Sequence, residues 1–269
     1  MAPSDQLDAE VRFEWGPRGL DALLAGGVRT IVIVDVLRFT TAVDVACGRG
    51  AAITPWPAEN DAAAAEEASR RGALLALRSP PAGDTSQPSL SPVSLRNLQR
   101  ADHILLPSPN GATLAHRAAA GGVTVLAGCL RNAAAVAAAI AAFPVGVVAA
   151  GERWPDGSLR LAVEDAWGAG AVIAALSPPR TSTDPTAGLF ALFGEALQPV
   201  TSSKPPRTVS PEASWAATSV PDDLATLLPQ TASGRELAAA GWTLDIEVAA
   251  ARDVSQTVPM LDSAGTFRP

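Results

Sequence analysis

Residues 31–41 read Ile-Val-Ile-Val-Asp-Val-Leu-Arg-Phe-Thr-Thr. The four β-branched residues at 31–34 are typical of a strand that is buried on both faces, as in a parallel sheet. We expect this strand to end at Asp35 and a helix to follow, with the hydroxyl of Thr40 or Thr41 capping its first turn. Open α/β sheets bind ligands at this position, outside the carboxyl end of a strand. The alternative, that Asp35 is only a structural residue of the turn, is equally compatible with this stretch.

The composition narrows the class of protein. The chain has 269 residues, 48% of them hydrophobic, which is enough for one large or two modest cores. The net charge is −7 and basic residues do not gather, which argues against nucleic acid as a partner. Residues 1–10 lack the apolar core of a signal peptide, and Pro144 and Gly146 interrupt the uncharged stretch 133–150. Cys47 and Cys129 lie far apart in the sequence, which suits a reducing compartment better than a disulfide framework. We therefore expect a cytoplasmic protein, and the interrupted apolar stretch leads us to expect no membrane span.

Predicted strands and helices alternate along the chain. This alternation predicts an α/β fold with mainly parallel strands in three α/β/α layers. Residues 177–221 are rich in Pro, Ser and Thr and predict a loose connection with one helix at 187–197. The predicted strands are 11–15, 31–34, 51–55, 73–77, 103–106, 123–126, 145–149 and 257–261. The other predicted helices are 19–25, 40–46, 60–71, 112–120, 132–142, 163–176, 233–240 and 245–251.

A short internal repeat relates two of the predicted strand–helix turns. Residues 37–43 and 130–136 share Leu, Arg, Ala and Val at equivalent positions, and each segment follows a strand and opens a helix. We interpret this as an internal duplication; coincidence in an alanine-rich chain is the alternative. A duplication predicts two related lobes, residues 1–120 and 121–269, that present Arg38 and Arg131 across a cleft.

Polar residues also open three other predicted helices. Residues 108–112 read Ser-Pro-Asn-Gly-Ala, where Gly111 allows close backbone approach, and 128–132 read Gly-Cys-Leu-Arg-Asn, where Asn132 is a natural N-cap. Glu164 and Asp165 open a third helix, where acids ordinarily have a structural role because they offset the helix dipole. Helix starts beside arginines favour binding of an anion such as phosphate. Asp35 with an acidic pair favours Mg²⁺.

Common phosphatase signatures are absent. The residue two positions after Asp35 is Leu37 rather than a second acid, and neither cysteine is followed six residues later by an arginine. Walker and dinucleotide-binding loops are also missing.

Four motifs in order nevertheless carry a family resemblance. They are Asp-Val-Leu-Arg-Phe-Thr-Thr-Ala (35–42), Pro-Asn-Gly-Ala (109–112), Gly-Cys-Leu-Arg-Asn-Ala (128–133) and Val-Glu-Asp-Ala-Trp-Gly-Ala-Gly (163–170). Their order and spacing resemble the 2-phosphosulfolactate phosphatase (ComB) family over residues 11–176, and residues 233–259 resemble the tail of that family. The resemblance implies two related α/β/α lobes and Mg²⁺-dependent hydrolysis of (R)-2-phospho-3-sulfolactate to 3-sulfolactate, a step toward coenzyme M.

Two departures from the family pattern concern the substrate. Ser89-Leu90-Ser91-Pro92 stands where the family often has Gly-Asn before Ser-Pro, and residues 108–112 stand where it often has Thr-Thr-Asn-Gly-Thr. Another small phosphorylated hydroxy acid therefore stays open as the substrate.

Our working hypothesis gives each polar residue a role. Asp35 is a Mg²⁺ ligand, and Glu164 or Asp165 supplies a second carboxylate. Neighbouring residues on a helix point about 100° apart, so we expect only one of the pair to reach the metal and the other to bond backbone amides or support the site. Arg38 and Arg131 bind phosphate or sulfonate oxygens. The nucleophile is open between water, Asp35 and, more weakly, Ser91. The expected substrate-binding residues are Thr40, Thr41, Ser91, Asn110, Gly111 and Asn132.

Two other classes of protein remain as alternatives. A non-catalytic protein that binds a small phosphorylated or sulfonated anion could use the same helix starts without hydrolysing its ligand. In a structural protein these polar residues would not converge. The sequence is also compatible with a homo-oligomer.

Overall fold

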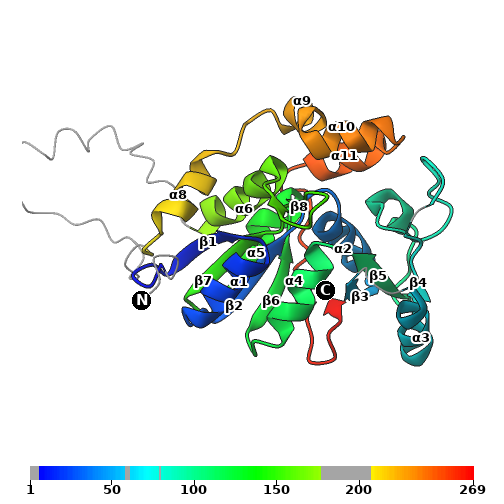
Figure 1. Ribbon diagram of the computed structural model, residues 1–269, viewed down its shortest axis with the longest axis horizontal. Coiled ribbons are helices and arrows are strands. Elements are labelled where there is room, and N and C mark those ends of the chain that lie inside the picture. Colours follow the sequence, from blue (N-terminus) through cyan, green and yellow to red (C-terminus); the bar gives the residue numbers. More distant parts are fainter. Residues whose placement is uncertain (1–5, 58–60, 79, 177–206) are drawn as a thin grey trace, which may run out of the picture.

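The computed structural model describes residues 6–57, 61–78, 80–176 and 207–269, so the helix expected at 187–197 lies outside the described residues (Figure 1). Within these ranges the protein is a mixed α/β fold around one large sheet. The order of its nine strands is β1-β7-β2-β6-β10-β11-β3-β5-β4. None of the helices in the described ranges combines the length and the apolar character that crossing a bilayer requires.

Two groups of parallel strands make up most of the sheet, which confirms the prediction of mainly parallel strands. An antiparallel hairpin, β10 and β11, joins the groups by pairing with β6 on one side and β3 on the other. The first group contains β1 (Val11–Trp15), β7 (Val145–Ala149), β2 (Thr30–Val34) and β6 (Thr124–Gly128). The second contains β3 (Ala52–Pro57), β5 (His103–Ser108) and β4 (Leu74–Leu75), and the hairpin strands are Met260–Leu261 and Phe267–Arg268.

Strand β2 is buried along its whole length, as the run of β-branched residues predicts. Successive side chains of a strand point to opposite faces, and those of β2 therefore enter two different cores. Ile31 and Ile33 pack with α1 (Gly16–Ala25), α2 (Phe39–Gly48) and α4 (Gly111–Ala119). Val32 and Val34 pack with α5 (Ala133–Ala139), α6 (Val163–Leu176) and α8 (Pro211–Thr218). Helices therefore cover the central strands from both sides (Figure 1).

The remaining elements surround this centre. Helices α9, α10 and α11 lie together at one end of the molecule, above α2 in Figure 1. The bounds are Asp61–Arg71 for α3, Leu224–Leu227 for α9, Ala232–Ala239 for α10 and Thr243–Ala250 for α11. Short 3-10 turns are η2 (Pro92–Leu95), η3 (Leu130–Asn132) and η4 (Leu228–Gln230), and a separate two-stranded hairpin is formed by β8 (Glu152–Arg153) and β9 (Leu159–Arg160).

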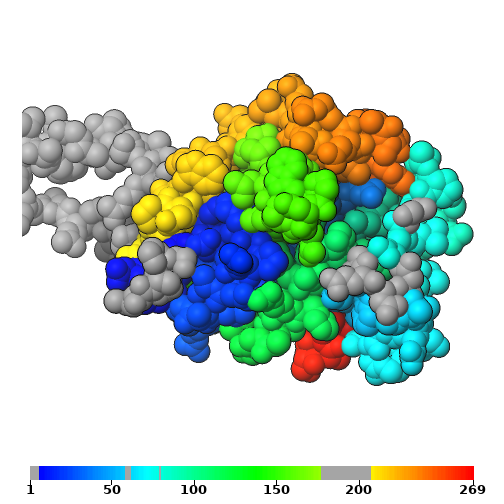
Figure 2. Space-filling model, in the orientation of Figure 1, coloured from blue at the N-terminus to red at the C-terminus, as the bar shows by residue number. Residues whose placement is uncertain are grey.

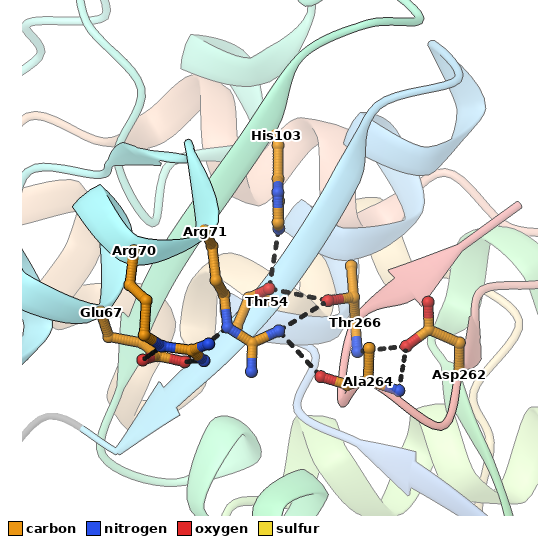
Figure 3. A network of polar contacts seen from close by, with 8 residues as sticks. All are labelled: Thr54, Glu67, Arg70, Arg71, His103, Asp262, Ala264 and Thr266. Carbon is orange, nitrogen blue, oxygen red and sulfur yellow. Dashed lines mark hydrogen bonds and ion pairs between the residues drawn. The ribbon is translucent and has the colours of Figure 1, made fainter.

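The C-terminal hairpin is fixed by a polar network (Figure 3). The hydroxyls of Thr266 and Thr54 lie 2.9 Å apart, and Thr54 Oγ1 also lies 2.8 Å from His103 Nε2. Arg71 Nη1 donates to the carbonyl of Ala264 at 2.8 Å. These contacts tie the hairpin to β3, to the start of β5 and to α3, so His103 has a structural role here.

Two local predictions were wrong. Residues 207–221 are not a loose connection throughout, because α8 begins at Pro211 with the Ser210 hydroxyl accepting a hydrogen bond from the Ala213 amide. Between the predicted strand 145–149 and the predicted helix 163–176, where no element is predicted, the structure has the β8–β9 hairpin. Both misses have the same cause: short elements carry too few apolar residues to show a period.

Strands from both predicted lobes interleave in the one sheet. Strand β2, from residues 1–120, lies between β6 and β7, which come from residues 121–269. The two lobes thus share one sheet. The lobe boundary at residue 120, the duplication and the three-layer arrangement stay predictions.

Candidate active site

The carboxyl ends of β2, β6 and β7 meet at one edge of the sheet, because these three strands are parallel neighbours. The helix after β2 packs in one core and the helix after β6 packs in the other, so the chain leaves these adjacent strands toward opposite faces. In α/β sheets such a switch point is where ligands bind. Asp35, Arg131 and Glu152 follow the three strands directly or within a few residues.

Asp35 is 5% exposed and both of its carboxylate oxygens accept backbone hydrogen bonds. Oδ1 accepts from the amide of Phe39 at 3.1 Å, and Oδ2 accepts from the amide of Gly111 at 2.8 Å. The N-cap residue of α2 is Arg38, and its side chain forms no cap; the amide of Phe39, the first residue of α2, donates to Asp35 instead. The predicted cap by Thr40 or Thr41 is therefore wrong.

The two threonine hydroxyls bond the backbone of the same turn. Thr40 Oγ1 donates to the Asp35 carbonyl at 2.8 Å and accepts from the Asp35 amide at 3.0 Å. Thr41 Oγ1 donates to the Val36 carbonyl at 2.7 Å. Both residues are fully buried, so these bonds favour a role in shaping the turn over the predicted contacts with substrate.

Gly111 brings the start of α4 against Asp35. A Cβ atom at this position would lie 2.7 Å from Asp35 Oδ2 and 2.4 Å from a ring carbon of Phe39, which no side chain could tolerate. The predicted close backbone approach at Gly111 is thus confirmed. Its neighbour Asn110 donates from Nδ2 to Glu152 Oε2 at 2.9 Å, which brings a further carboxylate to the site.

Glu164 and Asp165 lie beside Asp35 but are bonded differently. Asp165 Oδ1 accepts from the Val36 amide at 2.7 Å and Oδ2 accepts from the Gly151 amide at 2.9 Å, which ties together the turns after β2 and β7. Glu164 is 2% exposed and no described residue donates a hydrogen bond to its carboxylate, but its oxygens are not fully enclosed. Asp165 is therefore the member of the pair that bonds backbone amides, and these bonds favour a structural role for it over the predicted metal-ligand role.

Burial of several carboxylates together shifts their pKa values upward. Burial raises the pKa of Asp35 to about 6, with a further contribution from Glu164 and opposing effects of the two backbone amides. Burial, followed by the charge of Asp35, raises the pKa of Glu152 to about 7. Burial and its acidic neighbours Asp35 and Glu164 raise the pKa of Asp165 well above the ordinary value. Burial and mutual repulsion thus both disfavour the simultaneous ionisation of these carboxyl groups.

Asp35 and Glu164 fit a hard cation. Glu164 accepts no hydrogen bond from a described residue and its oxygens are not fully enclosed, so its carboxylate is free to bind a cation. As the side chains lie, no three His, Cys, Asp or Glu residues in the described ranges form a ready-made metal site. Magnesium sites commonly use only one or two carboxylates and complete the shell with water, so the donor set suits Mg²⁺.

The two predicted anion-binding arginines reach the same helix, α11. Arg38 Nη1 donates to Asp245 Oδ2 at 2.8 Å. Arg131 Nη1 donates to the carbonyl of Val248 at 3.0 Å, while its Nε donates to Asp44 Oδ2 at 2.8 Å. The charge of Arg38 acts on Asp35 and lowers the pKa of that carboxyl in opposition to burial. The structure therefore places Arg38 near the carboxylate of Asp35, and it places Arg131 beside α11, at Val248.

Ser91 and Asn132 are fully buried and use their side chains internally. Ser91 Oγ donates to Asp245 Oδ1 at 2.5 Å. Asn132 occupies the predicted N-cap position of α5, but its Oδ1 accepts from the Cys129 amide at 2.9 Å rather than from the helix. Its Nδ2 donates to the carbonyls of Ala127 and Thr257. These bonds favour structural roles over the predicted contacts with substrate.

Sequence reasoning missed Glu152, Asp44 and Asp245. Glu152 follows the Val-rich strand β7, so the rule that pointed to Asp35 after β2 could also have found it. Asp44 and Asp245 lie within helices, where an acid gives no sign of being buried beside an arginine; both are 1% exposed.

The β8–β9 hairpin and the helices α10 and α11 lie at the end of the molecule that contains the site. In Figure 2 the yellow-green atoms around β8 and β9 adjoin the orange atoms of α10 and α11. Glu152 belongs to β8 and Asp245 to α11, so both surface features contribute residues to the site.

The pKa shifts predict how stability depends on pH. Asp35 and Glu152 bind their protons more tightly in the folded protein than in the unfolded chain, so the stability that they contribute is complete below about pH 4 and lost as the pH rises through about 6 to 7. We expect Tm in EDTA to fall over this range and Mg²⁺ to raise Tm more at about pH 7.5 than at about pH 5. A double variant, Asp35→Asn with Glu152→Gln, should flatten the slope; an equally steep slope in that variant would contradict the assignment.

Comparison with known proteins identifies the family of the chain but does not test the site residues. A search of curated proteins found no match to the sequence. A family model described as 2-phosphosulpholactate phosphatase matches residues 24–264, a range that contains Asp35, Arg38, Glu152, Glu164 and Asp245. The chain therefore belongs to the 2-phosphosulpholactate phosphatase family and is a phosphoric monoester hydrolase.

Proposed function

We propose that this protein hydrolyses 2-phospho-3-sulfolactate to 3-sulfolactate and phosphate in a Mg²⁺-dependent reaction. The observation that carries the proposal is the buried carboxylate cluster of Asp35, Glu152 and Glu164 beside the guanidinium of Arg38, at the switch point of the sheet. Hydrolysis of a phosphate ester needs cationic groups that stabilise the charge on the phosphate oxygens. Arg38 is one such group, and a metal ion bound by the carboxylates would be another.

Asp35 and Glu164 are the proposed ligands of the metal. The buried carboxylate of Glu164, which lacks a donor within the described ranges, supports this choice. Asp35 is held by its two backbone amides, so it is oriented before a metal arrives. When bound, Mg²⁺ would stabilise the charge of the transferring phosphoryl group.

Arg38 and Arg131 are the proposed anion-binding residues. Arg38 uses one Nη atom for Asp245, which leaves other donors of its fork for phosphate or sulfonate oxygens. Glu152 is the carboxyl best suited to hold or release a proton near neutral pH, because its pKa is raised to about 7. The candidate nucleophiles are water and Asp35, and trapping of an acyl-phosphate would distinguish them.

The decisive experiment measures phosphate release from a panel of 2-phospho-hydroxy acids, with and without Mg²⁺. We expect turnover of 2-phospho-3-sulfolactate that requires Mg²⁺ and is lost in EDTA. Turnover of another member of the panel alone would keep the reaction and change the substrate. A protein that binds these anions without releasing phosphate in any condition would be the non-catalytic binding protein that is our second candidate.

We also propose the internal duplication and the three-layer arrangement that the sequence predicts. In support, β2 and β6 are parallel neighbours, and each is followed by an arginine that donates to a buried aspartate, Asp245 or Asp44. The second oxygen of each aspartate accepts a serine hydroxyl, from Ser91 or Ser255. We further propose that the protein is cytoplasmic and that its reaction is a step toward coenzyme M. The two cysteines support a cytoplasmic location, because both are buried free thiols.

A further inference from the structure

A buried carboxylate on α11 joins two site residues that are far apart in the sequence. Asp245 is 1% exposed, and its Oδ2 accepts from Arg38 Nη1 at 2.8 Å while its Oδ1 accepts from Ser91 Oγ at 2.5 Å. Because each oxygen accepts a hydrogen bond from a different residue, the orientation of the carboxylate is restricted. The direction in which it holds the guanidinium is then restricted as well.

Ser91 is itself held in place. It is fully buried, its amide donates to Ser89 Oγ at 3.2 Å, and its carbonyl accepts from both the amide and the hydroxyl of Ser94. The Ser91 hydroxyl donates to Asp245 Oδ1, and the other oxygen of the same carboxylate accepts from Arg38, so the Ser91 hydroxyl is committed to the carboxylate that holds Arg38. The arrangement therefore favours support of Asp245 over nucleophilic attack as the role of Ser91.

Arg38 is confined on its other side by an aromatic ring. Its guanidinium carbon lies 5.1 Å from the ring centroid of Trp242, within the range of a cation–π contact. Among the described residues, the carboxylate of Asp245 is the one acceptor that Arg38 donates to. Its side chain is 15% exposed, so Nε and Nη2 are left to bind an external anion.

Within the described part of the chain, Arg131, unlike Arg38, donates hydrogen bonds from its side chain to more than one acceptor. It donates to both Asp44 and the carbonyl of Val248, and its own carbonyl accepts from the amide of Ser255. Loss of one partner would leave Arg131 with the others. Arg38 has no such second acceptor in the described ranges, so its orientation depends on Asp245.

We propose that Asp245 is a positioning residue for the hydrolysis: it orients Arg38 so that the free edge of the guanidinium meets an anionic oxygen of the substrate. The inference rests on the proposed function and adds a residue to it. Asp245 acts through Arg38, and Ser91 acts through Asp245.

A double-mutant cycle tests this chain of action. We expect Asp245→Asn to lower kcat/KM by about 10- to 100-fold, the value of a charge-assisted hydrogen bond. In an Arg38→Ala background the same substitution should cost less than about twofold, because its target is gone. Ser91→Ala should give a smaller loss that also disappears in that background, which keeps the test available if Asp245→Asn folds poorly. The matched control is Asp21→Asn, which removes the carboxylate that pairs with Arg117 at the far end of α4 and should leave kcat/KM unchanged.

A spectroscopic readout separates this inference from the function on which it rests. The ¹⁵N NMR signal of the Arg38 Nε–H group, identified by its loss in Arg38→Ala, should shift or broaden in Asp245→Asn and stay unchanged in Asp21→Asn. An unchanged signal in Asp245→Asn, or additive effects in the cycle, would overturn the positioning role even in an active phosphatase. If the wild-type protein releases no phosphate from any ester, the proposed function and the catalytic part of this inference fail together, and the NMR signal then shows whether Asp245 still holds Arg38.

Discussion

Asp35→Asn is expected to lower kcat by about 100- to 1,000-fold or more, because it removes the carboxylate that we propose as a metal ligand. The substitution keeps the shape of the side chain and relieves repulsion with Glu164, while it costs one acceptor for the amide of Phe39 or Gly111. These stability effects oppose each other. We therefore expect a folded protein that has lost its turnover.

The measurement is Mg²⁺-dependent phosphate release by purified Asp35→Asn, with thermal unfolding to verify the fold. Asp8→Asn, a substitution of an exposed aspartate near the N-terminus, serves as the control and should match the wild-type rate. A near-normal Mg²⁺-dependent rate in Asp35→Asn would refute the role that we give to this carboxylate.

Adjacent carboxylates on α6 are expected to respond in opposite ways. Asp165→Ala should lower the free energy of unfolding by about 2–5 kcal/mol, because the amides of Val36 and Gly151 would both lose their buried acceptor. Glu164→Gln removes a buried charge that has no donor among the described residues, so it should leave stability unchanged or higher while lowering Mg²⁺-dependent turnover.

Urea unfolding and phosphate release on both variants provide the comparison, each serving as the control for the other. If Glu164→Gln retained full Mg²⁺-dependent turnover, Glu164 would not be a ligand. If Asp165→Ala were as stable as the wild-type protein, the two backbone bonds would not be the role of Asp165.

The strong signals in the sequence were those that follow from long periodic or β-branched runs. Strand β7 at Val145–Ala149 and helix α6 at Val163–Leu176 have the bounds that the sequence predicts. Strand β2 is buried on both faces, as the run at 31–34 indicates. Such elements are specified by residues that are neighbours in the chain, so reading the chain in order finds them.

Side-chain partners depend on contacts that no local pattern encodes. Asp35 was identified because it follows a strand, but its bond to the amide of Gly111 spans 76 residues. The pairing of Arg38 with Asp245 spans 207 residues. Thr40, Thr41 and Asn132 have the right chemistry to bind substrate, and only the folded structure reveals that their polar atoms bond neighbouring backbone groups.

The hairpin of β10 and β11 has a consequence for synthesis on the ribosome. Within the described residues, β10 pairs with β6 and β11 pairs with β3, so residues 260–268 connect the two parallel groups of strands. Until residues 260–268 have been synthesised, the sheet cannot be completed, and the edges of β6 and β3 that pair with the hairpin stay unpaired. Truncation by about ten residues should produce the same incomplete sheet permanently, with unpaired edges that favour aggregation.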